Sequence, residues 1–293
     1  MHTVFPNRAL YAVPLAHGRV LALGERPLVM GVLNVTPDSF ADARHPTTEE
    51  AIATGLRMEE EGADLIDVGG ESTRPGGAPV ALEEEARRVI PVVRALAARV
   101  RVPLSIDTYK AEVARMAIAE GAALVNDISG LQYDPALGGV IAATGAALIV
   151  MHNRGCSQNM YADAEYADVA GEVLSELGRR IHSAIDAGVA RERVIIDPGI
   201  GFAKRAAHSY GVLARLHEFA KALDRPLLVG PSRKSFMSAA LGGRLAPDRD
   251  WGTAAAVTAA VLAGAHVVRV HAVGAMTQVV RVAEAIRRGG DHE

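Results

Sequence analysis

A short pattern recurs along this chain: a glycine followed by an alanine, then a run of apolar residues that leads to a polar one. Four copies occur, at residues 61–71, 120–126, 144–152 and 263–271. In each copy the glycine suits the left-handed conformation in which many helices end, and the apolar run suits a strand buried on both faces. The pattern therefore predicts helices that alternate with parallel strands.

Four further apolar runs extend the set to eight strands. Val29–Asn34 stops at a polar Asn34, and the other three runs occupy residues 102–107, 194–197 and 227–230. The segments between strands are predicted to be helical and include Leu82–Ala98 and Tyr210–Leu223. Eight such units in 293 residues, without a linker of different composition, predict an α/β fold, a single-domain (β/α)8 (TIM) barrel. A doubly wound sheet, the alternative, would carry a glycine-rich fingerprint after its first strand.

The residues outside the barrel are few. Residues 1–27 are predicted to form an extension in which Ala9–Pro14 pairs with Arg19–Leu23 as a hairpin that closes the bottom of the barrel. The barrel itself is expected at 28–288, and 289–293 as a disordered tail. Thr47 and Glu50 have the spacing of a capping box at the start of a helix.

Composition narrows the class of protein. Hydrophobic residues make up 49% and the net charge is −3, so nothing favours nucleic acid or an anionic membrane as a partner. The single cysteine, Cys156, cannot form an internal disulfide, which suits a reducing compartment. No apolar run approaches the ~20 residues of a membrane span. We therefore expect a soluble cytoplasmic protein.

The carboxyl ends of barrel strands converge on one funnel, so polar residues there are candidates for function. Asp107 and Asp197 end apolar strands, where an unpaired carboxylate is costly. Each could cap a helix or pair with a base, but we favour a planar ligand rich in N–H groups. Asn126 could complete the site because an amide both donates and accepts. His152 could be a satisfied core histidine, and we assign it no chemistry.

Two further segments suggest anion binding. Ser232 is a plausible N-cap after the seventh strand, with Lys234 and Ser235 in the first helical turn. Free N–H groups and the helix dipole favour an anion there, and a bound anion would explain a lysine in that turn; the alternative is a lysine that faces solvent. Arg269 and His271 are two residues apart, hence on one face of the last strand, and arginine suits the lumen better than the helix layer.

The stretch from Gly69 to Gly77 is rich in glycine and contains Thr73 and Arg74. Such a segment is typical of a mobile loop, here one that presents these two side chains to the funnel. A solvated surface arginine is the alternative.

These segments resemble the motifs of the dihydropteroate synthases, enzymes of folate synthesis, in order over residues 29–286. The motifs are NVTPDSF (34–40), DVGGESTRPG (67–76), SIDT (105–108), VNDISG (125–130), DPGIGFAK (197–204), SRKSF (232–236) and RVH (269–271). The resemblance implies a transferase that condenses 6-hydroxymethyl-7,8-dihydropterin pyrophosphate with 4-aminobenzoate, giving 7,8-dihydropteroate and pyrophosphate. We also expect a homodimer.

The resemblance further implies a role for each matching residue. The implied ligands and contacts are Asp107, Asn126, Asp197 and Lys234 for the pterin, Thr73, Arg74, Arg269 and His271 for the pyrophosphate, Asn34 for Mg²⁺, and Ser235, Pro75 and Phe202 for 4-aminobenzoate. The implied chemistry is displacement at the pterin methylene without a covalent enzyme intermediate. Mg²⁺, Arg269 and His271 would stabilise the departing pyrophosphate, with Lys234 as the third catalytic residue.

The chain departs from the family pattern in three places, of which Ile200 in the DPGIGF segment is taken as neutral. Residues 41–44 read Ala-Asp-Ala-Arg where the family usually has Ser-Asp-Gly-Gly, and Ala272 replaces an aspartate. The altered loop leaves open a catalytically silent pterin-binding paralogue. A methyltetrahydrofolate-using corrinoid methyltransferase on the same barrel is a second alternative, which the residues expected around pyrophosphate and aminobenzoate disfavour.

Overall fold

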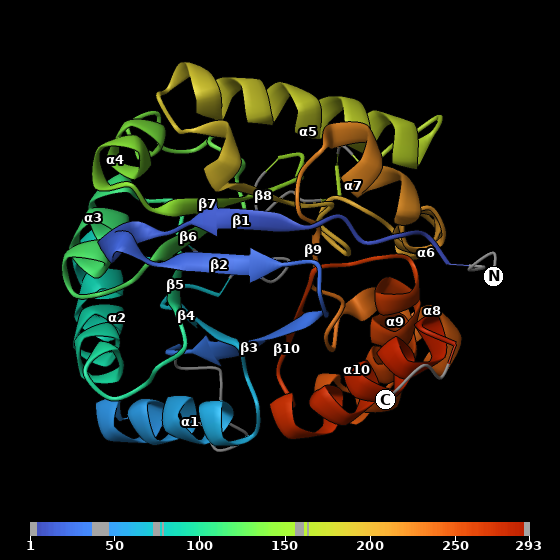
Figure 1. The fold of residues 1–293 in the computed structure, drawn as a ribbon, viewed down its shortest axis with the longest axis horizontal. Coiled ribbons are helices and arrows are strands. Elements are labelled where there is room, and N and C mark those ends of the chain that lie inside the picture. Colours follow the sequence, from blue (N-terminus) through green and yellow to red (C-terminus); the bar gives the residue numbers. More distant parts are fainter. Residues whose placement is uncertain are drawn as a thin grey trace.

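The eight buried strands form one closed parallel sheet. The computed structural model describes residues 5–36, 47–72, 77, 79–155, 161–162 and 164–289. The strands neighbour one another in the order β8-β7-β6-β5-β4-β3-β10-β9, and a parallel bridge between Ile196 and Leu227 joins the two outer strands. The helices surround this sheet (Figure 1). The predicted (β/α)8 barrel is confirmed, and closure excludes the doubly wound sheet, which has two free edges.

The strand bounds follow the predicted apolar runs closely. Leu104 begins its strand two residues later than predicted, because Pro103 lacks the N–H that a ladder hydrogen bond requires. The strands are β3 (Leu28–Asn34), β4 (Leu65–Gly69), β5 (Leu104–Asp107), β6 (Leu124–Asp127), β7 (Ala147–Met151), β8 (Val194–Asp197), β9 (Leu228–Val229) and β10 (Val267–Val270).

The helices begin and end largely where local signals predict. The Thr47 side chain and Glu50 form the expected capping box, and the four pattern glycines at 62, 121, 145 and 264 all have positive φ. The predicted single helix Tyr210–Leu223 is wrong, because the backbone leaves the helical region at Arg215 (φ −114°, ψ 18°). The α-helices are α1 (Thr48–Glu60), α2 (Leu82–Ala97), α3 (Ala111–Ala119), α4 (Leu137–Thr144), α5 (Val169–Asp186), α6 (Ala206–Ala214), α7 (His217–Leu223), α8 (Ser238–Leu241), α9 (Asp250–Leu262) and α10 (Val273–Arg287).

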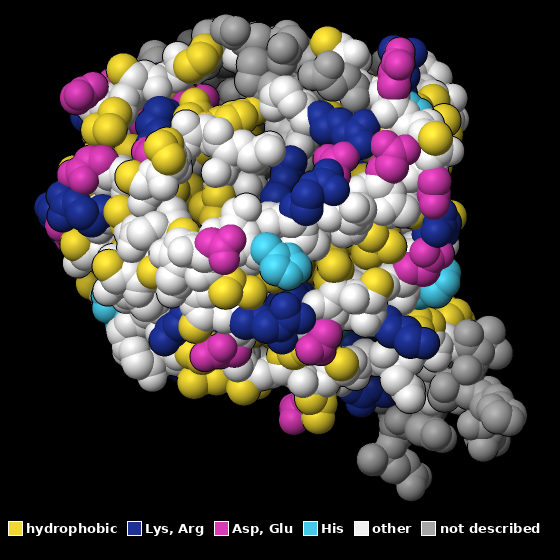
Figure 2. Space-filling model, turned by 90° about the horizontal axis from the view of Figure 1, so that it is seen from above, with side chains coloured by type: hydrophobic (Ala, Val, Ile, Leu, Met, Phe, Trp, Pro, Cys, Tyr) yellow, Lys and Arg dark blue, Asp and Glu magenta, His cyan; other side chains and the backbone are white. Residues whose placement is uncertain are grey.

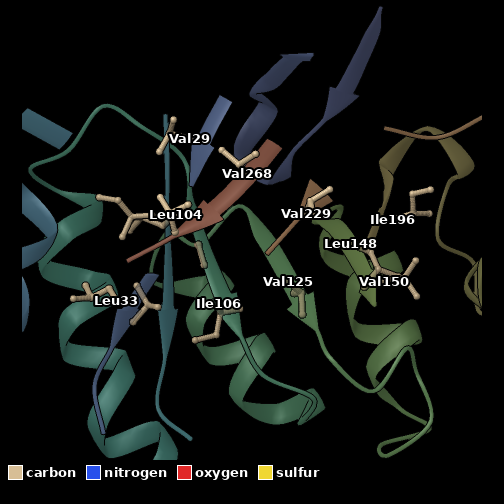
Figure 3. Packing of buried hydrophobic residues seen from close by; sticks show 14 of the residues in the cluster. Val29, Leu33, Leu104, Ile106, Val125, Leu148, Val150, Ile196, Val229 and Val268 are labelled. Atoms are coloured by element: carbon tan, nitrogen blue, oxygen red, sulfur yellow. The ribbon is translucent and has the colours of Figure 1, made fainter. Parts of the chain in front are cut away.

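The two faces of the barrel strands pack into two separate cores. One core joins the outward faces of the strands to the helices; Figure 3 labels ten of its residues, among them Val29, Ile106 and Val268. The other core fills the lumen and includes Met30, Leu65 and Leu124. Because side chains alternate between faces along a strand, residues two apart from a lumen residue also face the lumen.

The N-terminal hairpin closes the lower end of the lumen, as predicted. Strands β1 (Tyr11–Pro14) and β2 (Val20–Leu23) pair antiparallel and cross the middle of the ring of helices in Figure 1. Their inward side chains belong to the lumen core. Arg8, just before the hairpin, connects this segment to the barrel by hydrogen bonds. Its Nε donates to the Ala265 carbonyl (2.9 Å) and its Nη2 donates to Glu284 (2.9 Å).

Two features of the remaining surface bear on the expectations above. On the face shown in Figure 2, the described acidic and basic side chains are interspersed. Within the described ranges, no helix combines the length and the apolar character that crossing a membrane requires. Residues 290–293 of the predicted tail, Cys156 and residues 41–44 lie outside the part of the chain that the structure describes.

Candidate active site

The strand register brings the predicted polar residues to one level of the barrel. Asn34 is paired with Gly69, Gly69 with Asp107, and Asp107 with Asn126. These positions alternate with the outward core residues of their strands, so their side chains face the lumen. The carboxyl ends of β3 to β6 thus present a row of amide and carboxylate groups.

Arg269 of β10 faces the lumen, as predicted, and reaches two carboxylates. Its Nε donates to Asp67 Oδ2 and its Nη2 donates to Asp107 Oδ2, both over 2.6 Å. Asn126 Nδ2 donates to the same Asp67 oxygen over 2.8 Å. The sequence-based site did not include Asp67, although a carboxylate inside the apolar run Leu65–Val68 is a usable signal. One fully buried carboxylate therefore orients two of the predicted ligand-binding side chains.

Burial controls the charge of this cluster. It raises the pKa of Asp107 to about 7, an effect that Arg269 opposes and Asp67 reinforces. Burial also raises the pKa of Asp197, opposed chiefly by the Lys234 ammonium. Buried carboxylates with raised pKa values are well suited to a ligand that offers N–H donors, because each donor stabilises the ionised form.

Asp197 and Lys234 form the other side of the lumen. Asp197 ends β8, and its Oδ1 accepts from the Gly199 N–H (2.8 Å). Lys234 Nζ donates to the Ile200 carbonyl (2.6 Å) and lies 4.4 Å from the centre of the Phe202 ring. Burial lowers the pKa of Lys234 to about 8, opposed first by Asp197. Asp197 and Phe202 therefore belong to one loop after β8, and Lys234, from the segment after β9, contacts that loop.

A glycine keeps this side of the lumen open. A Cβ on Gly230 would lie 3.6 Å from Arg269 Cβ and 4.0 Å from Asp197 Oδ2. The backbone between β9 and the following turn thus runs between the two charged side chains, and a larger residue would fill the space between them.

The prediction that Ser232 caps a helix is wrong. Its hydroxyl instead lies 2.9 Å from His271 Nδ1 and accepts from the His271 N–H (3.2 Å). Arg233 has a positive φ (58°) and turns the chain, held by Thr253 and Asp250. The helix that follows is a three-residue 3-10 turn, Ser235–Met237, with Lys234 at its N-cap, so Lys234 is not within a first helical turn.

Exposed Ser235 begins that short turn, and His271 lies beside Ser232 just beyond β10. Thr73, Arg74 and Pro75 lie outside the described residues. The chain just before them is anchored, because Glu71 accepts from the Tyr109 hydroxyl (2.7 Å) and pairs with Lys110 (2.5 Å).

His152 is a satisfied core histidine, as the sequence suggested. It is fully buried, with Nε2 2.9 Å from Glu176 Oε2 and Nδ1 2.8 Å from Lys204 Nζ. Lys204, buried beneath the Asp197 loop, was not among the predicted site residues. Its only signal in the sequence is its place at the end of the motif DPGIGFAK.

A closed parallel barrel whose lumen presents carboxylates, an amide and cations above an apolar floor defines the class of pterin-binding barrel enzymes. Residues 30–271 match the family model described as "Pterin binding enzyme". The chain is 45% identical to the dihydropteroate synthase of Synechocystis sp., over 94% of this chain and 96% of that protein. The chain belongs to the dihydropteroate synthase family, and it is therefore a transferase of folate synthesis.

Two solved structures show the same architecture. The dihydropteroate synthase of Yersinia pestis in a sulfonamide drug complex has a TM-score of 0.88 at 42% identity, over 93% of this chain and 98% of that one. The enzyme of Burkholderia cenocepacia complexed with 7,8-dihydropteroate has a TM-score of 0.85 at 41% identity, over 96% and 98%. At these identities the likeness extends beyond the barrel fold alone.

Proposed function

We propose that this chain joins 6-hydroxymethyl-7,8-dihydropterin pyrophosphate to 4-aminobenzoate. The amine nitrogen attacks the pterin methylene, the C–N bond forms as the C–O bond to pyrophosphate breaks, and the nitrogen loses one proton. The products are 7,8-dihydropteroate and pyrophosphate. The observation that carries the proposal is the cluster of buried Asp107, Asn126 and Asp197 with half-buried Lys234 around one lumen.

The donor and acceptor groups on the edges of the pterin ring match those of this cluster. Asp197 keeps one carboxylate oxygen for N–H donors, since its other oxygen accepts from Gly199. Asn126 donates to Asp67, and its amide oxygen has no hydrogen-bond partner among the described residues. Lys234 supplies a donor to the accepting edge of the ring.

The pyrophosphate is assigned to Arg269 and His271 at the end of β10, with Thr73 and Arg74 as further expected contacts. Cations at that place stabilise the charge that develops as the C–O bond breaks. Arg269 is held by two carboxylates, so its guanidinium is oriented before substrate arrives. Orientation in advance lowers the reorganisation that catalysis requires.

Mg²⁺ is proposed as the metal, with Asn34 as its protein ligand. The Asn34 side chain is half-buried at the end of β3 and makes no hydrogen bond within the described residues. No group of three acidic, histidine or cysteine side chains in those residues could hold a metal. Mg²⁺ commonly keeps several waters and binds substrate phosphates. The donor set therefore fits an ion that arrives with pyrophosphate and, when bound, neutralises its charge.

The 4-aminobenzoate is assigned to the outer part of the funnel. Ser235 is exposed at the start of its 3-10 turn, so its hydroxyl and N–H can meet a carboxylate. Phe202, half-buried under Lys234, and Pro75 would contact the aromatic ring. The sulfonamide complex of the Yersinia pestis relative supports the same ligand class here.

We also propose a cytoplasmic homodimer. Trp251 at the start of α9 is 89% exposed, and Val282 and Ile286 on α10 are 61% and 53% exposed. Helices α9 and α10 pack against each other, so these apolar side chains lie on neighbouring elements. Sedimentation of Trp251→Glu should give a monomer where the unmodified chain gives a dimer; equal sedimentation of the two proteins would contradict this.

One turnover assay tests the proposed reaction. The chain with the pterin pyrophosphate, 4-aminobenzoate and Mg²⁺ should release pyrophosphate and form dihydropteroate. Pterin binding without turnover would instead identify the silent paralogue. Methyl transfer from methyltetrahydrofolate to a corrinoid would identify the other alternative.

Asp197→Asn tests the assignment of the pterin site. It replaces an acceptor by a donor, a buried mismatch worth ~1–3 kcal/mol, so the pterin should bind about 5- to 150-fold more weakly. Asp248→Asn, at an exposed acid, is the matched control. If calorimetry gives equal pterin affinities for Asp197→Asn and Asp248→Asn, the assignment of Asp197 to the pterin site is ruled out.

A further inference from the structure

Lys204 is a buried cation with three acceptors around its ammonium group. Its side chain is 1% exposed. Nζ lies 2.8 Å from His152 Nδ1, 3.1 Å from the Gly199 carbonyl and 3.0 Å from the Phe202 carbonyl. An ammonium has three N–H groups and matches all three acceptors, whereas a neutral amine would turn a lone pair toward one of them. The geometry therefore fits the charged form.

The partner of Lys204 is itself fixed. Since His152 Nδ1 accepts from Lys204, the ring proton is on Nε2 and donates to Glu176 (2.9 Å). Burial lowers the pKa of His152 to about 3, so the ring is neutral. Glu176 also accepts from Arg154. A continuous set of hydrogen bonds thus connects Lys204 to helix α5.

The loop above Lys204 is tightly wound. Gly199, Gly201 and Ala203 all have positive φ (67°, 80° and 47°), and a Cβ on Gly199 would lie 2.0 Å from the His152 carbonyl oxygen. An alanine in this conformation costs roughly 1 kcal/mol, so other contacts must hold it there. Lys204 binds the two ends of the loop, through the Gly199 and Phe202 carbonyls.

The same loop carries two residues of the proposed substrate site. Asp197 accepts from the Gly199 N–H, so the position of Gly199 sets the position of the carboxylate. Phe202 provides both a carbonyl for Lys204 and the ring beneath Lys234. A change at Lys204 therefore reaches the pterin subsite and the aminobenzoate subsite together.

We propose that Lys204 is a positioning residue of the synthase reaction, which shapes the 199–203 loop and whose positive charge keeps Asp197 ionised for the pterin. It contacts neither substrate. The proposal rests on the proposed function, in that Asp197 is taken to bind the pterin.

Other charged groups also act on Asp197 and on Lys204, and their effects on the Asp197 carboxylate must be separated from that of Lys204. Asp197 is faced by Lys234 and Arg269 as well as by Lys204. Burial lowers the pKa of Lys204 well below its usual value; Asp197 and Glu176 oppose this lowering, and Arg180 and Lys234 add to it. Lys234 donates to one carbonyl of the loop, that of Ile200, whereas Lys204 donates to two, those of Gly199 and Phe202.

A purely structural lysine makes a different prediction from a charged one. If Lys204 only filled space, its replacement would weaken pterin binding equally at every pH. If its charge acts on Asp197, its loss raises the pKa of that carboxyl, which is then protonated at a higher pH. The acid-side midpoint of pterin binding should therefore move upward.

The experiment compares pterin affinity from about pH 5 to about pH 9 in Lys204→Met and Lys204→Gln, with unmodified enzyme as reference. Glutamine is neutral but still donates to carbonyls, so it keeps more of the loop shape and serves if the methionine variant does not fold. We expect at least tenfold weaker binding at neutral pH and an upward shift of the acid-side midpoint in both variants.

The outcomes separate this inference from the proposed function. If the acid-side midpoint of pterin binding does not move in Lys204→Gln while Asp197→Asn binds the pterin weakly, only the role of Lys204 is overturned. An Asp197→Asn enzyme that binds the pterin normally overturns the proposed pterin site instead. Sulfonamide affinity in the presence of pyrophosphate should also fall in both Lys204 variants, and unchanged affinity would overturn the link to Phe202.

Discussion

A single oxygen of Asp67 holds one residue of the proposed pterin site and one of the proposed pyrophosphate site. A pair of substitutions at Asp67 can separate the effect of its shape from that of its charge. Oδ2 accepts from Arg269 Nε and from Asn126 Nδ2, while Oδ1 has no partner among the described residues. In Asp67→Asn the amide oxygen can take the place of Oδ2 and accept both bonds, and the NH₂ group takes the place of Oδ1. Asp67→Ala removes both acceptors.

The two variants should differ in stability by several kcal/mol. Asp67→Ala leaves buried Arg269 with only Asp107 and leaves the Asn126 amide unpaired, which should cost ~3–5 kcal/mol. Asp67→Asn weakens one charge-assisted hydrogen bond, which should cost ~1–2 kcal/mol. Part of that cost is offset, because the negative charge of Asp67 no longer raises the pKa of Asp107.

Pterin binding should also be impaired more by Asp67→Ala than by Asp67→Asn. In Asp67→Ala the ligand must order the side chains of Arg269 and Asn126, which costs about 2 kcal/mol in all and weakens binding about 30-fold. In Asp67→Asn both side chains stay in place, so affinity should change by less than about fivefold.

Urea unfolding and calorimetric pterin titration measure both effects, with exposed Asp186→Asn as control. The slope of unfolding with urea should be the same in all variants. The reasoning is refuted if Asp67→Ala binds the pterin within about threefold of the unmodified enzyme. It is equally refuted if Asp67→Asn is as unstable as Asp67→Ala, since that would assign the effect to charge alone.

Three further changes test other parts of the structure. Burial lowers the pKa of Lys234 to about 8, so its positive charge is lost as pH increases through that value, and KM for the pterin pyrophosphate should rise. Lys234→Arg should abolish this rise. A rise that persists in Lys234→Arg contradicts the assignment. Gly199→Ala should lower the free energy of unfolding by more than about 3 kcal/mol, because the new Cβ would meet the His152 carbonyl oxygen. Gly242→Ala has a similar φ but open space around the Cβ, and should lower it by only about 1 kcal/mol. Equal losses in the two variants would show that the contact with the carbonyl does not matter. Arg8→Met removes the buried partner of Glu284, which keeps the more exposed Arg288 (3.0 Å), and should cost ~1.5–3 kcal/mol in urea unfolding. The kcat should be unchanged, so a changed kcat would contradict a purely structural role.

The sequence by itself determined the features that depend on neighbours along the chain. The capping box at Thr47 and the glycines that end helices are local, because each satisfies backbone groups within a few residues. The lumen position of Arg269 followed from the two-residue period of a strand and from the cost of placing an arginine under a helix. The number of strands followed from repeated apolar runs, and closure from that number.

Only the tertiary structure decided which side chains meet across the lumen. Asp67 and Arg269 are far apart in the chain, and nothing local to either specifies that they share a hydrogen bond. Ser232 has the residue type of an N-cap, but His271, just beyond β10, hydrogen-bonds to its hydroxyl instead. The surroundings of Lys204 likewise depend on the fold, because its acceptors are supplied by His152, just after β7, and by the 199–203 loop. Burial then sets the charges of these groups, because desolvation depends on the whole barrel and not on any one segment.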